Sequence, residues 1–288
     1  MINLLICPSY RREVVFFSRD TPLASMPLLG QSLLEYWLSA LSLRGASKAI
    51  VLAHEQPAAI VEVVGKGQRW GLDANVITES RELTPDEALL KYASELDPVP
   101  RPDSIIVVDH FPGVPEQPLF TSYQAAFRAI RQWLPSALTV DRVGVSEARP
   151  GIWLSCHSHV SPHAQLVAPC WIGQHVFIGA DALIGPGAIV EDGSFIEPEV
   201  ELVESWVCSD TFVGRFAKIY GSIAWGNALI NWQTNSATQI ADPFLLCALR
   251  RPRQAHPANW LKRLSGIYAR NKSEVGLLWK HLLLHKEG

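Results

Sequence analysis

A six-residue repeat between residues 160 and 225 is the feature that most constrains how this 288-residue chain can fold. Aliphatic residues recur at every sixth position from Val160 to Leu202, and the series resumes after a one-residue slip, from Val207 to Trp225. The period matches neither the turn of a helix nor the alternation of one long strand. It predicts short strands joined by tight corners, with the aliphatic side chains inside and with glycine at corners whose backbone angles other residues adopt only at a cost.

Each repeat unit can bury its apolar side only against its neighbours, so the array is stable as a stack. This pattern resembles that of the hexapeptide-repeat proteins. The resemblance implies a left-handed parallel β-helix over residues 151–235, and it implies the left-handed winding as well, which the spacing alone does not predict.

The first 110 residues alternate between apolar strand patterns and amphipathic helix patterns. Strands are expected at 3–7, 48–53, 74–79 and 103–110, and helices at 31–46, 57–67, 83–96 and 122–134. Thr84 is a predicted helix N-cap, because Pro85 follows it and acidic residues fill the first turn. Strands alternating with helices predict a mostly parallel sheet covered on both faces, followed by a linker at 140–151.

Residues 25–54 and 65–80 resemble the sugar-phosphate nucleotidyltransferases, such as the mannose-1-phosphate guanylyltransferases. The matching positions are Pro27, Gly30, Leu34, Trp37, Gly45 and His54. The resemblance implies an α/β plus β architecture in three parts: a truncated Rossmann-like nucleotidyltransferase domain at 1–150, the left-handed parallel β-helix at 151–235, and a C-terminal extension with a helical tail at 236–288.

Members of that family join a nucleoside triphosphate to a sugar 1-phosphate and release pyrophosphate. This chemistry needs a glycine-rich loop whose amides reach the phosphates, cationic side chains, and a carboxylate that holds Mg²⁺. Residues 7–22 contain no glycine, and Leu23 stands where the family has a lysine. The family's second glycine-bearing motif, near the base pocket, falls where this chain has Asp86 and Glu87, which would repel phosphate. The family's metal-binding aspartate falls near Phe111.

These departures favour a catalytically inactive protein, a pseudoenzyme with no catalytic residue and no cofactor. Its role would be regulatory or scaffolding, in nucleotide-sugar metabolism or surface-polysaccharide biosynthesis. A partner nucleotidyltransferase or sugar transferase is expected, together with self-association into a homo-oligomer.

Two enzyme alternatives stay open. In an active nucleotidyltransferase with a divergent loop, Arg11 and Arg12 would bind the nucleotide and Asp109 would hold Mg²⁺. In a hexapeptide-repeat acyltransferase, one histidine would act as general base. The candidate bases are His157, His159, His163 and His175.

Composition narrows the other functional classes. The formal net charge of −3, without a lysine or arginine cluster, argues against a nucleic-acid partner. Five cysteines without a CxxC pair favour reduced thiols, and the absence of a signal peptide pattern favours a cytoplasmic protein. The tail at 260–288 mixes leucines with basic residues. It could contact a membrane surface peripherally, but we favour packing against the protein, since Gly266 and Gly276 interrupt the helix.

Overall fold

The structure is a computed structural model that describes residues 2–19, 21–96, 104–138, 142 and 144–249. These residues belong to one compact unit. The expected C-terminal tail lies outside the described residues, so its packing stays a prediction, as does the three-part domain division. No helix among the described residues has both the length and the apolar character needed to cross a bilayer.

A four-stranded parallel sheet forms the core of the N-terminal part. Its strands run β1 (Ile2–Ile6), β4 (Lys48–Ala53), β5 (Asp73–Thr78) and β6 (Ile105–Val107), in the spatial order β5-β4-β1-β6. Strands β1 and β4 are almost entirely buried, as expected for a parallel sheet covered on both faces. The strand–helix alternation read from the sequence is therefore confirmed.

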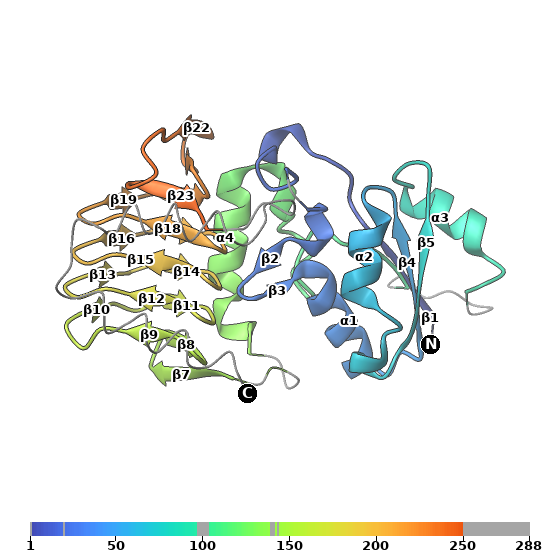
Figure 1. The fold of residues 1–288 in the computed structure, drawn as a ribbon. Helices are drawn as coiled ribbons and strands as arrows, with labels where there is room; N and C mark the ends of the chain where they lie inside the picture. The colour runs from blue at the N-terminus through green and yellow to red at the C-terminus, as the bar shows by residue number, and fades with distance from the viewer. Residues whose placement is uncertain (1, 20, 97–103, 139–141, 143, 250–288) are drawn as a thin grey trace, which may run out of the picture. The chain divides into compact units, whose positions relative to one another are not determined.

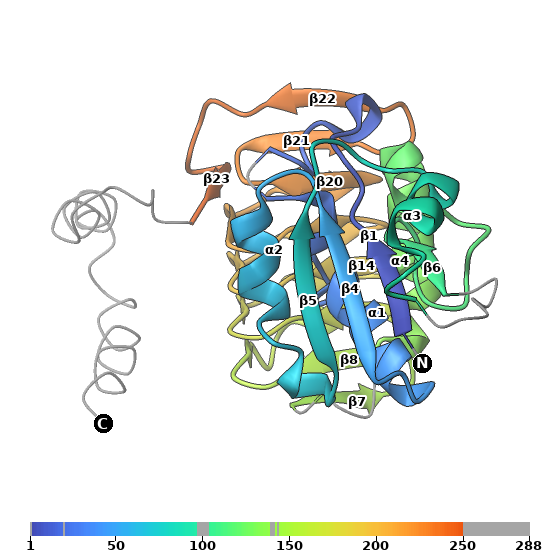
Figure 2. The ribbon, with the colours of Figure 1, turned by 90° about the vertical axis from the view of Figure 1, so that its right-hand side faces the viewer.

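The described residues form four α-helices, namely α1 (Leu33–Leu43), α2 (Pro57–Val64), α3 (Pro85–Tyr92) and α4 (Tyr123–Trp133). Ser32 and Thr84 each begin a helix with a capping box, which confirms the predicted N-cap at Thr84. Helix α3 packs on one face of the sheet, and α1 and α2 pack on the other (Figures 1 and 2). Short 3₁₀ helices lie at Arg12–Val14, Leu23–Ser25, Gln68–Trp70, Leu119–Thr121 and Leu134–Ser136.

Residues 152–225 form a parallel β-helix with three sheets, which we call the prism (Figure 1). The first face contains β8 (Ile152–Ser155), β11 (Cys170–Ile172), β14 (Ala188–Val190), β17 (Trp206–Val207) and β20 (Ser222–Trp225). The second contains β9 (His159–Val160), β12 (Phe177–Ile178), β15 (Phe195–Ile196) and β18 (Thr211–Val213). The third contains β10 (Gln165–Leu166), β13 (Leu183–Ile184), β16 (Glu201–Val203) and β19 (Lys218–Tyr220). The left-handed winding stays a prediction of the resemblance.

The repeat positions form the prism interior, with one correction. Ile172, Ile178 and Ile184 are completely buried there, as the period predicts. Trp225, however, packs outside the prism, and Ala224 takes the interior position of its strand. The reason is a second one-residue slip, which pairs Val207 with Ala224 instead of with Trp225.

Glycines after the interior residues serve two purposes. Gly185 has the positive φ angle that the sequence predicts, at 101°, whereas the close approach of neighbouring coils explains Gly173 and Gly179. Gly173 and Gly179 do not have positive φ angles. A Cβ at Gly173 would lie 2.6 Å from the Asp192 nitrogen, and one at Gly179 would lie 2.4 Å from the Pro198 nitrogen. Glycine is needed at these corners because neighbouring coils approach too closely for any side chain.

Antiparallel strands extend the prism at both ends. Strand β7 (Val145–Arg149) pairs with β8, so the linker predicted at 140–151 is wrong where this strand forms. Strands β21 (Ala228–Asn231) and β22 (Ser236–Gln239) continue the first face, and β23 (Leu246–Ala248) pairs with β18. These strands form hydrogen-bonded ladders on the prism, so the chain continues along it after residue 225.

A column of large apolar side chains points outward from the first face. Its members are Trp153, Trp171, Ile189, Trp206 and Ile223, which pair in register from strand to strand. All are buried in one cluster with the N-terminal core. The Phe17 ring lies 5.3 Å from that of Trp206, and α4 contributes Phe127, which stacks on Trp232 at 4.7 Å. The first face is therefore the surface on which the α/β part is built.

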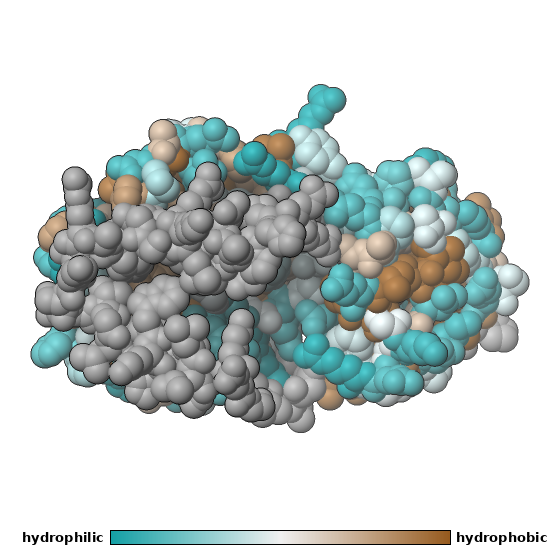
Figure 3. Space-filling view, in the orientation of Figure 1, coloured by the Kyte–Doolittle hydropathy of each residue, from teal (hydrophilic) through white to brown (hydrophobic). Residues whose placement is uncertain are grey.

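The outer helices of the α/β part are less completely covered. Figure 3 shows apolar side chains gathered over the region where Figure 1 places α2. Val61 of this helix is 49% exposed, and Leu43 at the end of α1 is 69% exposed. The column on the first face is thus better buried than the apolar residues on the outer helices.

Truncating the first-face column should destabilise the whole compact unit. We expect Trp206→Ala to lower the free energy of unfolding by about 3–5 kcal/mol, because a fully buried indole leaves a cavity. Urea unfolding followed by circular dichroism measures this change. Phe195→Ala, on the partly exposed second face, is the matched control and should cost clearly less. Equal losses for the two variants would contradict the assignment of the first face as the main interface.

Candidate functional site

The carboxyl edge of the parallel sheet is the first place to look for a site. In open α/β sheets, ligands bind outside the carboxyl ends of the strands, where the strand order reverses. Here β4 and β5 extend the sheet on one side of β1, and β6 lies on the other side. The order therefore reverses between β1 and β6, which places the segments beginning at Cys7 and Val108 at that point.

The segment after β1 uses its own backbone amides to bind carboxylates of this chain. The Ser9 N–H donates to Glu82 Oε2 at 2.9 Å, and the Tyr10 N–H donates to Glu55 Oε1 at 3.0 Å. Arg11 forms a two-pronged pair with Glu82, at 2.8 Å from Nη1 and 2.7 Å from Nη2. Amides and a guanidinium that would suit a phosphate are thus already engaged.

Electrostatics favour this closed arrangement. Burial raises the pKa of the Glu82 carboxyl, but the hydrogen bonds from Arg11 and Ser9 outweigh burial and hold that pKa below its ordinary value. The hydrogen bond that Arg11 donates to Glu82 raises the pKa of Arg11, and the charge of Asp109 adds to this effect. Beneath the pair, burial and the Glu82 charge raise the pKa of the Cys7 thiol to about 12, so Cys7 stays protonated and unreactive at neutral pH.

The three residues named from sequence end up in different situations. Arg11 is bound to Glu82, whereas Arg12 is exposed at the start of a 3₁₀ helix. Asp109 follows β6, and its Oδ1 lies 2.7 Å from Nδ1 of His110. Electrostatics couple Asp109 to Arg11, so the structure brings these two residues into one neighbourhood.

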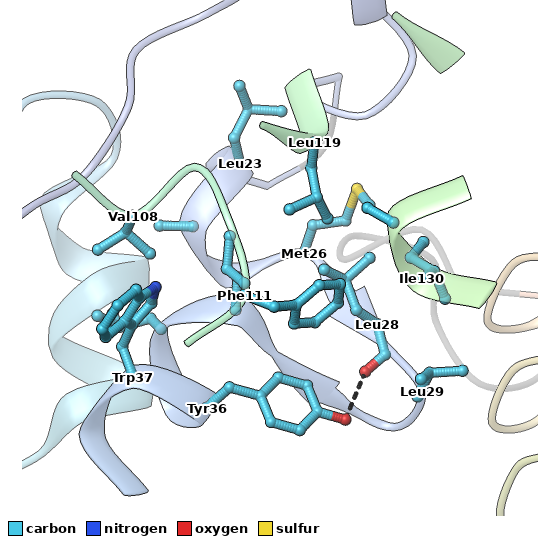
Figure 4. Packing of buried hydrophobic residues seen from close by; sticks show 14 of the residues in the cluster. Leu23, Met26, Leu28, Leu29, Tyr36, Trp37, Val108, Phe111, Leu119 and Ile130 are labelled. Atoms are coloured by element: carbon cyan, nitrogen blue, oxygen red, sulfur yellow. Dashed lines mark hydrogen bonds between the residues drawn. The ribbon is translucent and has the colours of Figure 1, made fainter. Parts of the chain in front are cut away.

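The fit of this edge to Mg²⁺ is poor. Arg11 places a positive charge near Asp109, and a cation there opposes a second cation. No group of three or more metal-ligating side chains is found in the part of the chain that the structure describes. Phe111, at the family's aspartate position, is 2% exposed and packs in the core beside Met26 and Leu28 (Figure 4). We derive no metal-dependent step at this edge.

Two of the candidate histidines share a corner of the prism. His157 and His175 are exposed, have positive φ angles, and stack with ring centroids 5.2 Å apart. The charge of His175 interacts with the carboxylate of Asp192 on the next coil. The two remaining candidates, His159 and His163, are also exposed, but they lie outside this corner.

The second face carries a ladder of rings from His159 through Phe177 and Phe195 to Phe212. Successive centroids lie 5.4, 4.4 and 5.9 Å apart, and the interplanar angles of 10° to 20° mean that the rings stack face to face. The three phenylalanines are half-buried, so the ladder presents ring edges at the surface. This face is the apolar counterpart of the first face, without the α/β part over it.

Sequence reasoning missed the residues that close the sheet edge, namely Glu82 and Glu55. Each follows the end of a predicted strand, which is the one signal that could have drawn attention to them. It also missed the outward column of the first face. That column was visible as a tryptophan or isoleucine immediately before the interior residue of every third repeat unit.

Comparisons with known proteins identify no family. No protein-family model matches the chain, and no curated protein matches it. Among solved structures, a variant of GDP-perosamine N-acetyltransferase from Caulobacter crescentus, in complex with CoA and GDP-perosamine, matches at 16% identity over 61% of this chain and 77% of that one, with a TM-score of 0.20.

A second match is the acetyltransferase domain of PglB from Neisseria gonorrhoeae in complex with acetyl coenzyme A. It is 14% identical over 62% of this chain and 82% of that one, with a TM-score of 0.21. Overlap this low carries no argument about what the present chain binds or does. Its function has to be argued from its own residues.

The Arg11–Glu82 pair should contribute modestly to stability, with a defined pH dependence. We expect Arg11→Met to cost about 1 kcal/mol at pH 7, because a third of the Arg11 side chain is in water that screens the pair. Since the pKa of Glu82 is lowered by folding, its contribution is present above the unfolded value of 4.5 and is lost as the pH falls below it.

The difference between wild type and Arg11→Met should therefore shrink between pH 6 and pH 3, as measured by urea unfolding at each pH. Arg81→Met is the matched control, since its pair with Glu87 is exposed, and it should cause no measurable change. A loss from Arg11→Met that stayed constant down to pH 3 would show that the Glu82 charge is not involved.

Proposed function

We propose that this chain is a catalytically inactive relative of the sugar-phosphate nucleotidyltransferases, with a regulatory or scaffolding role in nucleotide-sugar or surface-polysaccharide metabolism. The observation that carries the proposal is the closed carboxyl edge. The amides of Ser9 and Tyr10 bind Glu82 and Glu55, and Arg11 binds Glu82. These carboxylates take the positions in which phosphate oxygens would accept hydrogen bonds.

A triphosphate bound at this edge would have to displace Glu82. That exchange breaks a two-pronged ion pair and leaves a carboxylate facing the negative charge of the phosphates. The loop lacks glycine, so its backbone has little freedom to move toward a ligand. Asp109 offers a single carboxylate for Mg²⁺, and it already lies beside His110 and in the field of Arg11.

Binding surfaces support a non-catalytic role. The prism is a stiff stack of coils, and the aromatic ladder of its second face lies half-exposed along it. We assign this face to self-association or to a partner enzyme that acts on nucleotide sugars. The proposal includes no cofactor.

Nucleotidyl transfer is the reaction to test first. We expect purified protein with Mg²⁺, nucleoside triphosphates and sugar 1-phosphates to release no pyrophosphate. Calorimetry should detect no pyrophosphate binding to wild type, but measurable binding to Glu82→Ala, in which Ser9 and Arg11 lose their carboxylate partner. Glu87→Ala, which removes an exposed carboxylate, is the control and should behave like wild type. Pyrophosphate release that Asp109→Ala abolishes would defeat the proposal and favour the active nucleotidyltransferase.

Acyl transfer is the second candidate, and the corner with His157 and His175 favours it. An exposed imidazole beside the carboxylate of Asp192 has the surroundings of a general base. On this alternative, acetyl-CoA and an amino sugar linked to a nucleotide should give free CoA. His175→Ala should reduce the rate by a factor on the order of 10² or more, with His163→Ala as the control. Absence of turnover over a panel of such acceptors leaves the first proposal in place.

A further inference from the structure

A buried carboxylate joins the α/β part to the prism at a turn. Strands β2 (Pro27–Leu28) and β3 (Gln31–Ser32) form a short hairpin, and Leu29 and Gly30 at its turn have positive φ angles of 53° and 76°. Glu191, which follows β14 of the prism, is fully buried against this turn. Its Oε1 accepts from the Leu29 N–H at 2.5 Å, and its Oε2 accepts from the Gly30 N–H at 2.9 Å.

Arg142 holds the same turn from its carbonyl side. Its Nη2 donates to the Leu29 carbonyl, and its Nη1 donates to the Tyr36 hydroxyl at 2.9 Å and to the Ala137 carbonyl at 3.1 Å. The guanidinium also lies 4.6 Å from the ring centroid of Trp171 on the first face. The hairpin turn is thus held through its N–H groups by the Glu191 carboxyl and through its carbonyl by Arg142.

A second carboxylate enters the same space. A Cβ at Gly30 would lie 3.2 Å from both carboxylate oxygens of Asp192 and 2.7 Å from Arg142 Nη2. Asp192 Oδ1 also accepts from the Gln174 N–H at 2.7 Å. Two carboxylates, the fully buried Glu191 and the half-buried Asp192, therefore share the field of one guanidinium. Burying unbalanced charge is costly, and binding one proton removes the imbalance.

We propose that Glu191 is a proton-sensitive latch, whose protonated form fastens the hairpin of the α/β part to the prism more firmly than its ionised form. Burial raises the pKa of Glu191 to about 7, and the charge of Asp192 adds to this effect, while the two turn amides and Arg142 oppose it. Burial likewise raises the pKa of Asp192.

Other charged and titratable groups face this pair from each side. From the prism, His175 lowers the pKa of Asp192, whereas Asp210 raises it. On α1, burial raises the pKa of Tyr36, and the charges of Glu191 and Glu35 add to this effect, so the Tyr36 hydroxyl stays protonated. Charged groups of the prism and of the α/β part thus both influence the pKa values of Glu191 and Asp192.

The direction of the pH effect follows from the sign of the shift. Because folding raises the pKa of Glu191 above its unfolded value of 4.5, its favourable contribution is complete below pH 4.5 and is lost as the pH rises through about 7. Asp192 acts in the same direction. Between pH 5 and pH 8, the latch should therefore change the equilibrium constant of unfolding by a factor on the order of 10 to 100.

The test is urea unfolding of the full chain at intervals from pH 5 to pH 8. Wild type should lose stability as the pH rises, and Glu191→Gln should lose most of that dependence because its amide does not ionise. Glu62→Gln, on the exposed side of α2, is the control and should keep the wild-type dependence. Equal pH dependence in wild type and Glu191→Gln would overturn the proposal.

Hydrogen exchange provides a local readout that does not depend on the Glu191 variant folding. In wild type, the Leu29 and Gly30 amides should be less protected at pH 8 than at pH 6, after correction for the intrinsic exchange rate. Asp192→Asn should reduce this difference, because it removes the neighbouring charge. Protection of these two amides that is the same at both pH values would also overturn the proposal.

Discussion

The apolar column on the first face of the prism is the constraint on which the rest of this structure depends. A β-helix with tryptophans along one outer face has to cover that face, because exposing several indoles to water is costly. The α/β part supplies the cover, from Phe17 and from helix α4. The cover brings the hairpin turn at Leu29 against the prism, and that contact creates the buried site of Glu191.

Carboxylates of this chain accept hydrogen bonds from backbone amides at two separate places. Glu82 accepts from the Ser9 amide at the sheet edge, and Glu191 accepts from the Leu29 and Gly30 amides at the hairpin. Each carboxylate also has an arginine nearby. At the sheet edge Arg11 binds Glu82 directly, and at the hairpin Arg142 acts on Glu191 through its charge. The two carboxylates differ in burial, because Glu191 is fully buried and Glu82 is partly exposed to water. Arg11 holds the pKa of Glu82 down, whereas burial and Asp192 hold the pKa of Glu191 up.

At the sheet edge, charged side chains serve the structure of the chain itself. A phosphate-handling edge needs amides that wait for a ligand, but here the amides are engaged by the chain itself. Arg11 completes this arrangement through its ion pair with Glu82. On the second face of the prism the phenylalanines of the aromatic ladder are half-buried, whereas the apolar column of the first face is buried.

Local patterns determined much of this protein from the sequence alone: the strand–helix order, the cap at Thr84, and the stack of coils with its aliphatic interior. These features follow from periods and caps that span a few residues. Tertiary structure decided where the six-residue period shifts by one residue, which places Ala224 instead of Trp225 in the prism interior. It also decided that Arg11 meets Glu82, 71 positions away, and that Leu29 meets Glu191, 162 positions away. Such pairs depend on how the sheet and the prism pack, because no local spacing brings residues so far apart in sequence into contact.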